Sequence, residues 1–240
     1  MRLERQHFEE PTLDTSQQWD SLAEKYGLDV LAQRFILWPN LTTILKPKFE
    51  NTKVLDIGCG NGAYTRYFFE QGSNIIGIDT SGEQIRLSKK LNEGPEYVQT
   101  SGQDYINPNS FENLFANMVI CNIPTEEELQ KFFQTAYDNA TENGHLFVTN
   151  VSPEFQKTCD TKPLVHTYPT EVKDGSEFEI SLKTTKGTIG PFKNYHWSQK
   201  KLNEVATNNG WVLIESTYLN SESTDQDIWP TYIMYEYYKK

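Results

Sequence analysis

The sequence predicts an α/β fold built on a doubly wound, mostly parallel sheet. A short apolar run, residues 54–57, is bounded by glycines, as expected of a strand buried on both faces. Alternating glycines follow, then a helix-compatible segment over 63–71 and a second apolar run over 74–78 that ends in Asp79. This order of strand, glycine turn, helix, strand and acid is typical of the first half of a nucleotide-binding α/β domain.

The glycine turn leaves two cofactor classes open. Gly58-Cys59-Gly60-Asn61-Gly62-Ala63 formally satisfies the G-x-G-x-x-G/A pattern of NAD(P)-dependent oxidoreductases, in which a pyrophosphate rests on a helix N-terminus. S-adenosylmethionine has no phosphate, and it needs a carboxylate near its ammonium group, bare backbone beside its methionine part and an acid for its ribose. Asp56, Gly62 and Asp79 supply these groups, and a dinucleotide turn has no evident use for Asp56.

The run Asp56-Ile57-Gly58-Cys59-Gly60-Asn61-Gly62 resembles motif I of the class I S-adenosylmethionine-dependent methyltransferases. The resemblance implies that this run binds the cofactor together with Asp79 and Thr80, and that the methyl acceptor is a small molecule attacked at N or O. In the family, an acid after the third strand bonds the adenine amino group. Asp104 matches that acid by its position after the expected strand 96–99, and its neighbour Gln103 would line the adenine pocket.

Residues 1–50 are expected to form a helical lid segment ahead of the methyltransferase domain, which would span residues 51–240. After a polar tail, helices are expected over 15–26, 28–38 and 40–45, with Pro39 and Pro47 as stops. The phrase from Trp19 to Tyr26 resembles the N-terminal segment of many small-molecule methyltransferases, which folds over the cofactor. Tyr26 is therefore a candidate cofactor contact, although packing of both aromatic side chains against the core is the alternative.

The middle of the chain continues the alternation of strand and helix. A fourth strand is expected over 117–121, a helix over 126–143 and a fifth strand over 145–150. Asn122-Ile123-Pro124 would then lie where the fourth strand opens onto the active site. It partly matches the N-P-P-aromatic motif of amino-methyltransferases, but the second proline and the aromatic are missing, so a contact from Asn122 and its loop to cofactor or substrate is expected instead.

The last third of the sequence predicts a roof and a terminal hairpin. An insertion over 152–197 carries alternating stretches around 178–182 and 188–195, which indicate a β-hairpin above the active site. A helix over 199–208 precedes two strands, 211–218 and 231–238, which are joined without a helix. Such an edge hairpin is a hallmark of the resembled family, whose Rossmann-like seven-stranded sheet inserts its antiparallel last strand between the fifth and sixth.

Candidates for a general base are few. Methyl transfer is an in-line displacement in which a hydroxyl or ring nitrogen often needs a base, whereas an amine can lose its proton to water. His196 and Tyr195 at the end of the roof hairpin are candidate catalytic residues, as is His166 in an expected loop. Each of them is also compatible with a packing or surface role. For this reason a protein that binds S-adenosylmethionine without catalysis remains an alternative.

The composition limits the classes of partner that the protein is expected to bind. Net charge is −11 and the pI is about 4.9, which disfavours binding to a phosphate backbone and so to nucleic acid. No apolar run approaches membrane-spanning length, and the charged N-terminus lacks a signal-peptide pattern. Three cysteines argue for a reducing, cytoplasmic environment and against a disulfide framework or a metal site. A monomer and a homodimer both remain open.

Overall fold

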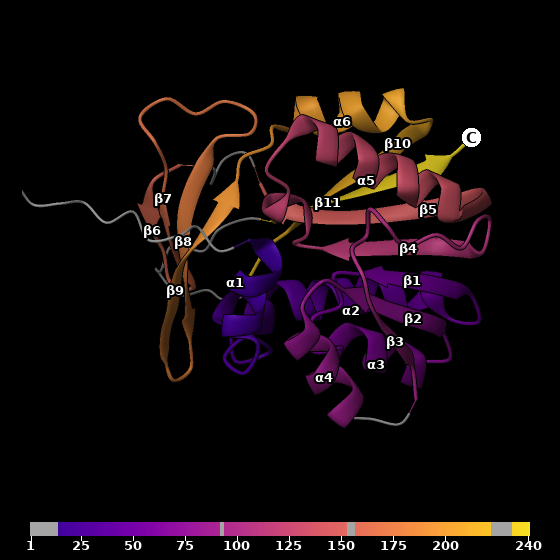
Figure 1. The fold of residues 1–240 in the computed structure, drawn as a ribbon, viewed down its shortest axis with the longest axis horizontal. Coiled ribbons are helices and arrows are strands. Elements are labelled where there is room, and N and C mark those ends of the chain that lie inside the picture. Colours follow the sequence, from indigo (N-terminus) through magenta and orange to yellow (C-terminus); the bar gives the residue numbers. More distant parts are fainter. Residues whose placement is uncertain (1–13, 92–93, 153–156, 222–231) are drawn as a thin grey trace, which may run out of the picture.

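A seven-stranded sheet forms the centre of the computed structural model, which describes residues 14–91, 94–152, 157–221 and 232–240 (Figure 1). The strand order is β10-β11-β5-β4-β1-β2-β3. The strands are β1 (Lys53–Ile57), β2 (Asn74–Asp79), β3 (Glu96–Gln99), β4 (Phe111–Asn117), β5 (Ala140–Val151), β10 (Trp211–Leu219) and β11 (Tyr232–Lys239). Neighbours among β1 to β5 pair in parallel, whereas β11 is antiparallel to both β5 and β10. The predicted doubly wound sheet with its antiparallel last strand is confirmed.

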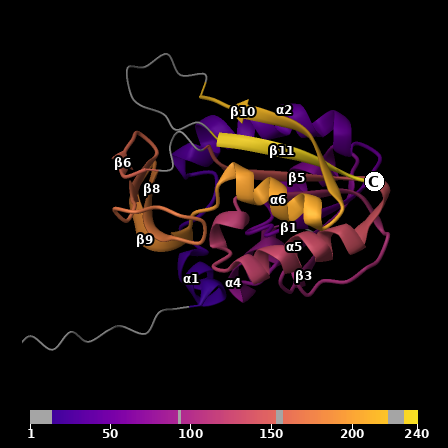
Figure 2. The same cartoon turned by 90° about the horizontal axis from the view of Figure 1, so that it is seen from above.

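Helices cover both faces of the sheet, as the amphipathic patterns predict (Figure 2). On one face lie α2 (Trp38–Phe49) and α3 (Ala63–Glu70); on the other lie α5 (Glu126–Asn139) and α6 (Gln199–Asn208). Phe49 of α2 packs against Phe68, Phe115 and Phe147 with ring centroids 4.8, 6.1 and 5.5 Å away. The α2 helix therefore packs into the main hydrophobic core.

The N-terminal helices differ from the expected ones. The structure has α1 (Thr15–Leu22), a π-helical turn η1 (Gln33–Leu37) and α2, which runs on directly from η1. Pro39 does not stop a helix here. It is the second residue of α2, directly after the π-helical turn η1, and the helical run continues through it. Pro47 lies only two residues before the end of α2 at Phe49, so the predicted stop at Pro47 was early.

The fourth strand was wrongly placed. β4 covers Phe111–Asn117, and residues 120–122 form the 3₁₀ turn η2 (Ile120–Asn122), so Asn117 ends this strand instead of starting it. The polar start of β4 concealed it, because Asn113 is buried there with its amide donating to Lys48 O (3.1 Å) and to Thr52 Oγ1 (2.9 Å). In addition, α5 ends at Asn139 and β5 begins at Ala140, five residues before the expected strand.

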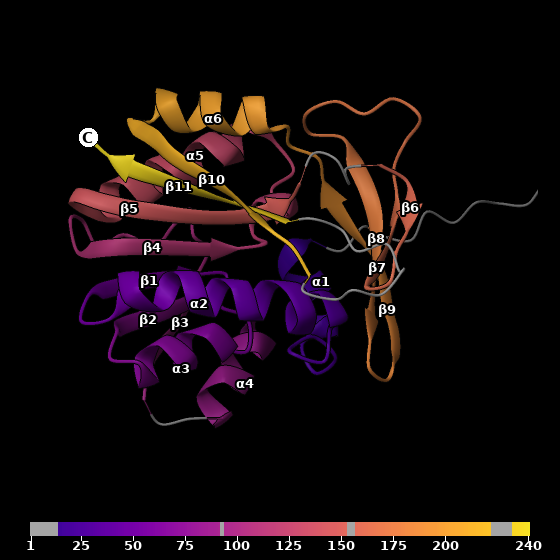
Figure 3. The same ribbon diagram turned by 180° about the vertical axis from the view of Figure 1, so that it is seen from behind.

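The roof is larger than the expected hairpin. It is a second sheet with the order β6-β7-β8-β9, formed by β6 (Cys159–Asp160), β7 (Leu164–Thr167), β8 (Glu177–Thr184) and β9 (Gly187–Tyr195). The hairpin of β8 and β9 is present, and β7 adds to the free edge of β8. In Figures 1 and 3 this sheet stands beyond the carboxyl end of β4, with α1 between the two sheets.

Among the described residues, no helix is long and apolar enough to cross a membrane. The predicted tail over residues 1–13 and the polar connection over 222–231 lie outside the described part of the chain.

Candidate cofactor and active site

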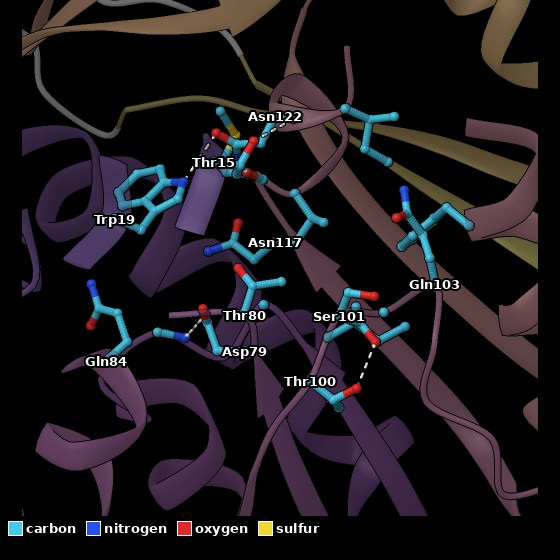
Figure 4. A pocket seen from close by; sticks show the side chains of 18 of the residues that line it. Thr15, Trp19, Asp79, Thr80, Gln84, Thr100, Ser101, Gln103, Asn117 and Asn122 are labelled. Carbon is cyan, nitrogen blue, oxygen red and sulfur yellow. Dashed lines mark hydrogen bonds between the residues drawn. The ribbon is translucent and has the colours of Figure 1, made fainter. Parts of the chain in front are cut away.

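The carboxyl ends of β1, β2, β3 and β4 open into one pocket of about 190 Å³, which α1 covers (Figure 4). Its wall contains backbone of the glycine turn, the end of β2, the loop after β3 and the loop after β4. The polar and charged side chains in this wall are Thr15, Tyr26, Asp79, Thr80, Gln84, Thr100, Ser101, Gln103, Asn117, Asn122 and Glu128. This is where ligands bind in open α/β sheets, outside the carboxyl edge of the strands.

The glycine turn adopts a conformation that glycine favours. Gly58, Gly60 and Gly62 have φ values of 70°, 54° and 78°, in the left-handed region that L side chains rarely occupy. The N–H groups of Gly58 and Cys59 both donate to Ile78 O, at 2.8 and 3.0 Å, which ties the turn to β2. Gly58 and Gly60 line the pocket, whereas Cys59 is buried outside its wall.

Two alanine substitutions in this turn should differ in their effect on the stability of the protein. An added Cβ at Gly62 would lie 2.5 Å from the hydroxyl of Tyr97, but at Gly60 the nearest atom would be Gln84 Oε1 at 3.8 Å. We expect Gly62→Ala to lower the free energy of unfolding by about 2–4 kcal/mol and Gly60→Ala by about 1 kcal/mol, since only the first adds a clash to the strain. Urea unfolding of both variants measures this difference, and equal losses would contradict it.

Asp79 holds the glycine turn and faces the pocket. Its carboxylate accepts hydrogen bonds from Gly60 N (2.8 Å) and Ser81 N (2.9 Å). Burial raises the pKa of Asp79, and the nearby charge of Asp20 acts in the same direction. Its neighbour Thr80 also lines the pocket. The carboxylate is therefore fixed in position before any ligand arrives.

Asp56 lies behind the turn instead of in the pocket wall. Its side chain is buried, and Thr65 Oγ1 donates a 2.6 Å hydrogen bond to Oδ2. Burial raises the pKa of Asp56 to about 7, and the negative charge of Asp79 adds to this. Two acids thus lie close together below the turn. A bound cation would offset their repulsion, whereas a diphosphate would increase it.

Gln84 is a pocket residue that the sequence reasoning missed. It lies in the first turn of α4 (Gly82–Leu91), is 2% exposed, and its Oε1 has no hydrogen-bond partner within the described part of the chain. A buried acceptor without a donor costs free energy, so a ligand hydroxyl or ammonium at this point would stabilise the structure. Gln84 and Asp79 lie on the same side of the pocket in Figure 4. Their acceptors suit the two hydroxyls of a ribose.

The loop after β3 contributes residues other than the expected acid. Thr100, Ser101 and Gln103 line the pocket, but Asp104 does not. The Asp104 carboxylate is exposed and bonded to Lys131 Nζ and Ser101 Oγ, both at 2.7 Å. Position after the strand therefore misdirected the adenine assignment, because the loop turns at residues 101–104 and carries Asp104 outward.

Glu128 was also missed in the sequence. It lies in the first turn of α5, a helix that Thr125 begins by accepting a hydrogen bond from Glu128 N. Its side chain reaches the pocket wall, and its carbonyl oxygen accepts a 3.2 Å hydrogen bond from Gln103 Nε2. Of the described side chains that line the pocket, only Asp79 and Glu128 carry a carboxylate, and none is lysine or arginine.

The lid helix α1 is held by hydrogen bonds on two sides of the pocket. Trp19 Nε1 donates to Asn122 Oδ1 at 3.2 Å, and Asp20 Oδ1 accepts from Ser81 Oγ (2.5 Å) and Glu83 N (3.1 Å). The α1 helix thus joins the loop after β4 to the beginning of α4. Tyr26 lines the pocket just after this helix.

Asn117 and Asn122 face the pocket from either side of the loop after β4 (Figure 4). The Asn117 Oδ1 accepts a 2.5 Å hydrogen bond from Thr149 Oγ1, which orients the amide. This placement could have been found by moving the end of the fourth strand back to Asn117. The apolar character of residues 118–121 favoured the wrong position.

The three candidate catalytic residues lie apart from this pocket. His166, Tyr195 and His196 line a cavity of about 10 Å³ below the roof, together with Tyr168 and Trp197. His166 is fully buried in β7 instead of lying in a loop. Burial lowers the pKa of His196, so its imidazole is neutral at pH 7. None of the three contributes to the wall of the main pocket.

Comparisons with known proteins agree with this geometry. Residues 55–148 match the model of a family described as a methyltransferase domain. That match spans β1, the glycine turn, Asp79 and β4 through most of β5. Residues 55–148 therefore contain a methyltransferase domain.

Two curated relatives of the methyltransferase domain act on different acceptors. The mitochondrial ubiquinone biosynthesis O-methyltransferase of Rattus norvegicus is 28% identical over 109 residues, covering 42% of this chain and 31% of that protein. The trans-aconitate 2-methyltransferase of Afipia carboxidovorans is 26% identical over 128 residues, covering 46% and 49%. The match therefore spans less than half the length of each of these two relatives.

Solved structures show the same fold. A putative S-adenosylmethionine-dependent methyltransferase from Listeria monocytogenes superposes with a TM-score of 0.63 at 21% identity, covering 85% of this chain and 97% of that one. The coverage extends well beyond the region matched by the family model, so the similarity of fold includes parts of the chain outside residues 55–148.

Proposed function

We propose that this protein transfers a methyl group from S-adenosylmethionine to a nitrogen or oxygen atom of a small molecule. The observation that carries the proposal is the charge of the pocket. Asp79 faces it, Asp56 lies behind it, and no lysine or arginine lines it within the described part of the chain. A sulfonium and an ammonium group are stabilised in such a field.

An NAD(P) dinucleotide fits the same pocket poorly. Its pyrophosphate carries two negative charges, which would approach the pair Asp56 and Asp79, and the described residues of the wall include no cationic side chain. The glycine turn still serves the proposed cofactor, because Gly58 and Gly60 present backbone without side chains to the pocket.

The residues that would hold the cofactor follow from their places in the wall. Asp79 and Gln84 present acceptors suited to ribose hydroxyls, Ser101 and Gln103 would contact the adenine, and Gly58 and Gly60 would leave room for the methionine part. Asp56 acts on the site through its charge and through the turn. We place the acceptor at the other end, near Trp19, Met118 and Asn122.

When bound, S-adenosylmethionine supplies a methyl group that an acceptor lone pair takes as the carbon–sulfur bond breaks and its electrons remain on sulfur. The protein's part is then to orient the acceptor and to exclude water. Asn117 and Asn122 present amides to the pocket, and α1 covers it. No histidine lines the pocket among residues 14–91, 94–152, 157–221 and 232–240. We propose that the acceptor loses its proton to water, and that His166, Tyr195 and His196 support the roof.

A binding titration tests the cofactor and separates the two cofactor classes. We expect S-adenosylhomocysteine to bind with a dissociation constant of about 1–50 µM by calorimetry, and NADH to show no heat at the same concentrations. Binding of NADH without binding of S-adenosylhomocysteine would sink the proposal. Methylation of any small acceptor in a screen with radiolabelled S-adenosylmethionine would exclude a protein that binds the cofactor without catalysis. The same preparation tests whether the protein is a monomer or a homodimer, and we propose a cytoplasmic location.

A further inference from the structure

A second cavity of about 40 Å³ lies next to the main pocket, between the N-terminal segment and the roof. Trp19, Tyr26 and Met118 line both cavities and form their common wall. The remaining walls come from residues 30–37, from the loop after β4 and from the roof strands β8 and β9. These residues are Val30, Ala32, Gln33, Leu37, Cys121, Ile180, Leu182, Phe192 and Asn194.

The described residues that line the second cavity carry no charge. None of its twelve lining residues is aspartate, glutamate, lysine, arginine or histidine. Burial raises the pKa of Tyr26 to about 12 and that of Cys121 to about 12, so both side chains are neutral at pH 7. A charged group that entered this space would lose its hydration without meeting a counter-charge, which is strongly unfavourable.

Aromatic rings shape the side of the cavity that faces the main pocket. The Trp19 ring meets Tyr26 at a centroid distance of 5.0 Å and Phe192 at 5.5 Å, both with T-shaped geometry. Ile180 and Leu182 of β8 add aliphatic surface from the roof. Flat apolar walls of this kind favour a flat apolar ring.

Two polar groups in the wall can still satisfy neutral hydrogen-bonding groups. Tyr64 Oη donates to Gln33 Oε1 and Gln33 Nε2 donates to Tyr26 Oη, both at 3.0 Å, which fixes the Gln33 amide. Tyr26 keeps its own hydroxyl proton, for which we find no acceptor in the described residues. Asn194 uses its Nδ2 on Cys121 O (2.9 Å) and Asn122 Oδ1 (3.2 Å), so its Oδ1 remains an acceptor.

We propose that this second cavity is the subsite for the methyl acceptor and that the acceptor is a neutral, mainly apolar ring compound. The ring lies between the lid and the roof, and its nucleophilic atom points past Trp19 and Met118 into the main pocket. Anionic and cationic acceptors are excluded because the cavity has no charge to balance them. This inference rests on the proposed function, since it deepens the acceptor side of the same site.

Three probes that share one phenol ring test the charge preference. At pH 7.5, 4-hydroxybenzamide is neutral, 4-hydroxybenzoate is an anion and 4-hydroxybenzylamine is a cation. Each is titrated calorimetrically into protein saturated with S-adenosylhomocysteine, which closes the main pocket to the probes. We expect the benzamide to bind at least about 10-fold more tightly than either charged probe, because only the charged groups must be desolvated without a partner.

A matched pair of variants tests the location. Leu182 lines the second cavity but not the main pocket, and Leu182→Phe should fill part of the space. Ile214 of β10 is 54% exposed and serves as the control, Ile214→Phe. We expect the first variant to weaken benzamide binding about 10-fold and the second to leave it within about two-fold. Both variants should bind S-adenosylhomocysteine as the parent does.

The outcomes separate this inference from the proposed function. If S-adenosylhomocysteine binds but a charged probe binds as tightly as the benzamide, or the benzamide does not bind, the neutral subsite is wrong and the methyltransferase proposal stands. Unchanged benzamide binding in Leu182→Phe would show that the acceptor binds outside the second cavity. If the parent protein does not bind S-adenosylhomocysteine, both proposals fall. The probe series on the parent protein decides the charge preference even if Leu182→Phe does not fold.

Discussion

Asp79→Asn should weaken the binding of S-adenosylhomocysteine by roughly 100-fold, equivalent to about 2.7 kcal/mol. The carboxylate accepts from Gly60 N and Ser81 N and also faces the pocket, where it can receive ligand hydroxyls. An amide loses the charge, and its NH₂ group must face one of these backbone donors. Calorimetry at pH 7.5 measures the loss, and thermal unfolding in parallel shows that the variant is folded.

Asp104→Asn is the matched control for this change. It makes the same substitution at a carboxylate that is exposed, bonded to Lys131 and absent from the pocket wall. We expect its affinity for S-adenosylhomocysteine to stay within about two-fold of the parent, since exposed ion pairs contribute little. A large loss of affinity in Asp104→Asn would show that Asp104 contacts the adenine, and it would contradict the assignment of Ser101 and Gln103 to that contact. A small loss in Asp79→Asn would contradict the assigned ribose contact.

Asp56→Asn should stabilise the free protein at pH 8. Burial raises the pKa of Asp56 to about 7, whereas its ordinary value is 3.8. Ionising this carboxyl in the folded state therefore costs roughly 4 kcal/mol at pH 8, at about 1.4 kcal/mol for each pKa unit. We expect the amide to recover about 1–3 kcal/mol of this, because its NH₂ group still has to be satisfied beside Thr65.

The pH dependence of this gain has a definite sign. A carboxyl with a raised folded-state pKa contributes its full stability below the unfolded-state pKa and loses it as the pH rises through the folded-state pKa. The difference between Asp56→Asn and the parent should grow from pH 4 to about pH 7 and then level off. Urea unfolding across this range measures it, and a variant less stable than the parent at pH 8 would overturn the expectation.

The same variant separates two roles of Asp56 in binding. A direct contact with the ligand ammonium, which the motif resemblance implies, predicts a loss of affinity as large as that of Asp79→Asn. The structure places Asp56 behind the turn and bonded to Thr65, which favours action through its charge. We therefore expect a smaller loss of about 3- to 10-fold for S-adenosylhomocysteine, because a charge at longer range contributes less.

The parts of the site that local sequence predicts are those where the backbone itself requires the residue type. Gly58, Gly60 and Gly62 have positive φ, so the spacing of the motif specifies the turn without reference to the rest of the chain. Asp79 follows because it ends the strand that hydrogen-bonds to this turn. The terminal hairpin is equally local, since the sequence predicts no helix between the two alternating strands, and a parallel pair needs a long crossover.

Other parts of the site could not be predicted from the sequence because they depend on packing between distant segments. The start of β4 is polar in sequence, and Asn113 is tolerated there only because Lys48 and Thr52 of another segment accept its amide hydrogens. Ser101 lines the pocket and Asp104 does not, because the loop after β3 turns at residues 101–104. Gln84 has no motif, and its buried acceptor is visible only once α4 is packed beside the turn.

The sequence by itself determined the fold class, the glycine turn, Asp79 and the cofactor class, because each rests on backbone geometry or on charge within one short segment. The tertiary structure alone decided which side chains line the pocket, that His166 and His196 lie outside it, and that an uncharged cavity adjoins it under the roof. The reason is physical. These features arise where α1, the loop after β4 and the roof meet, and no local pattern specifies how three distant segments pack.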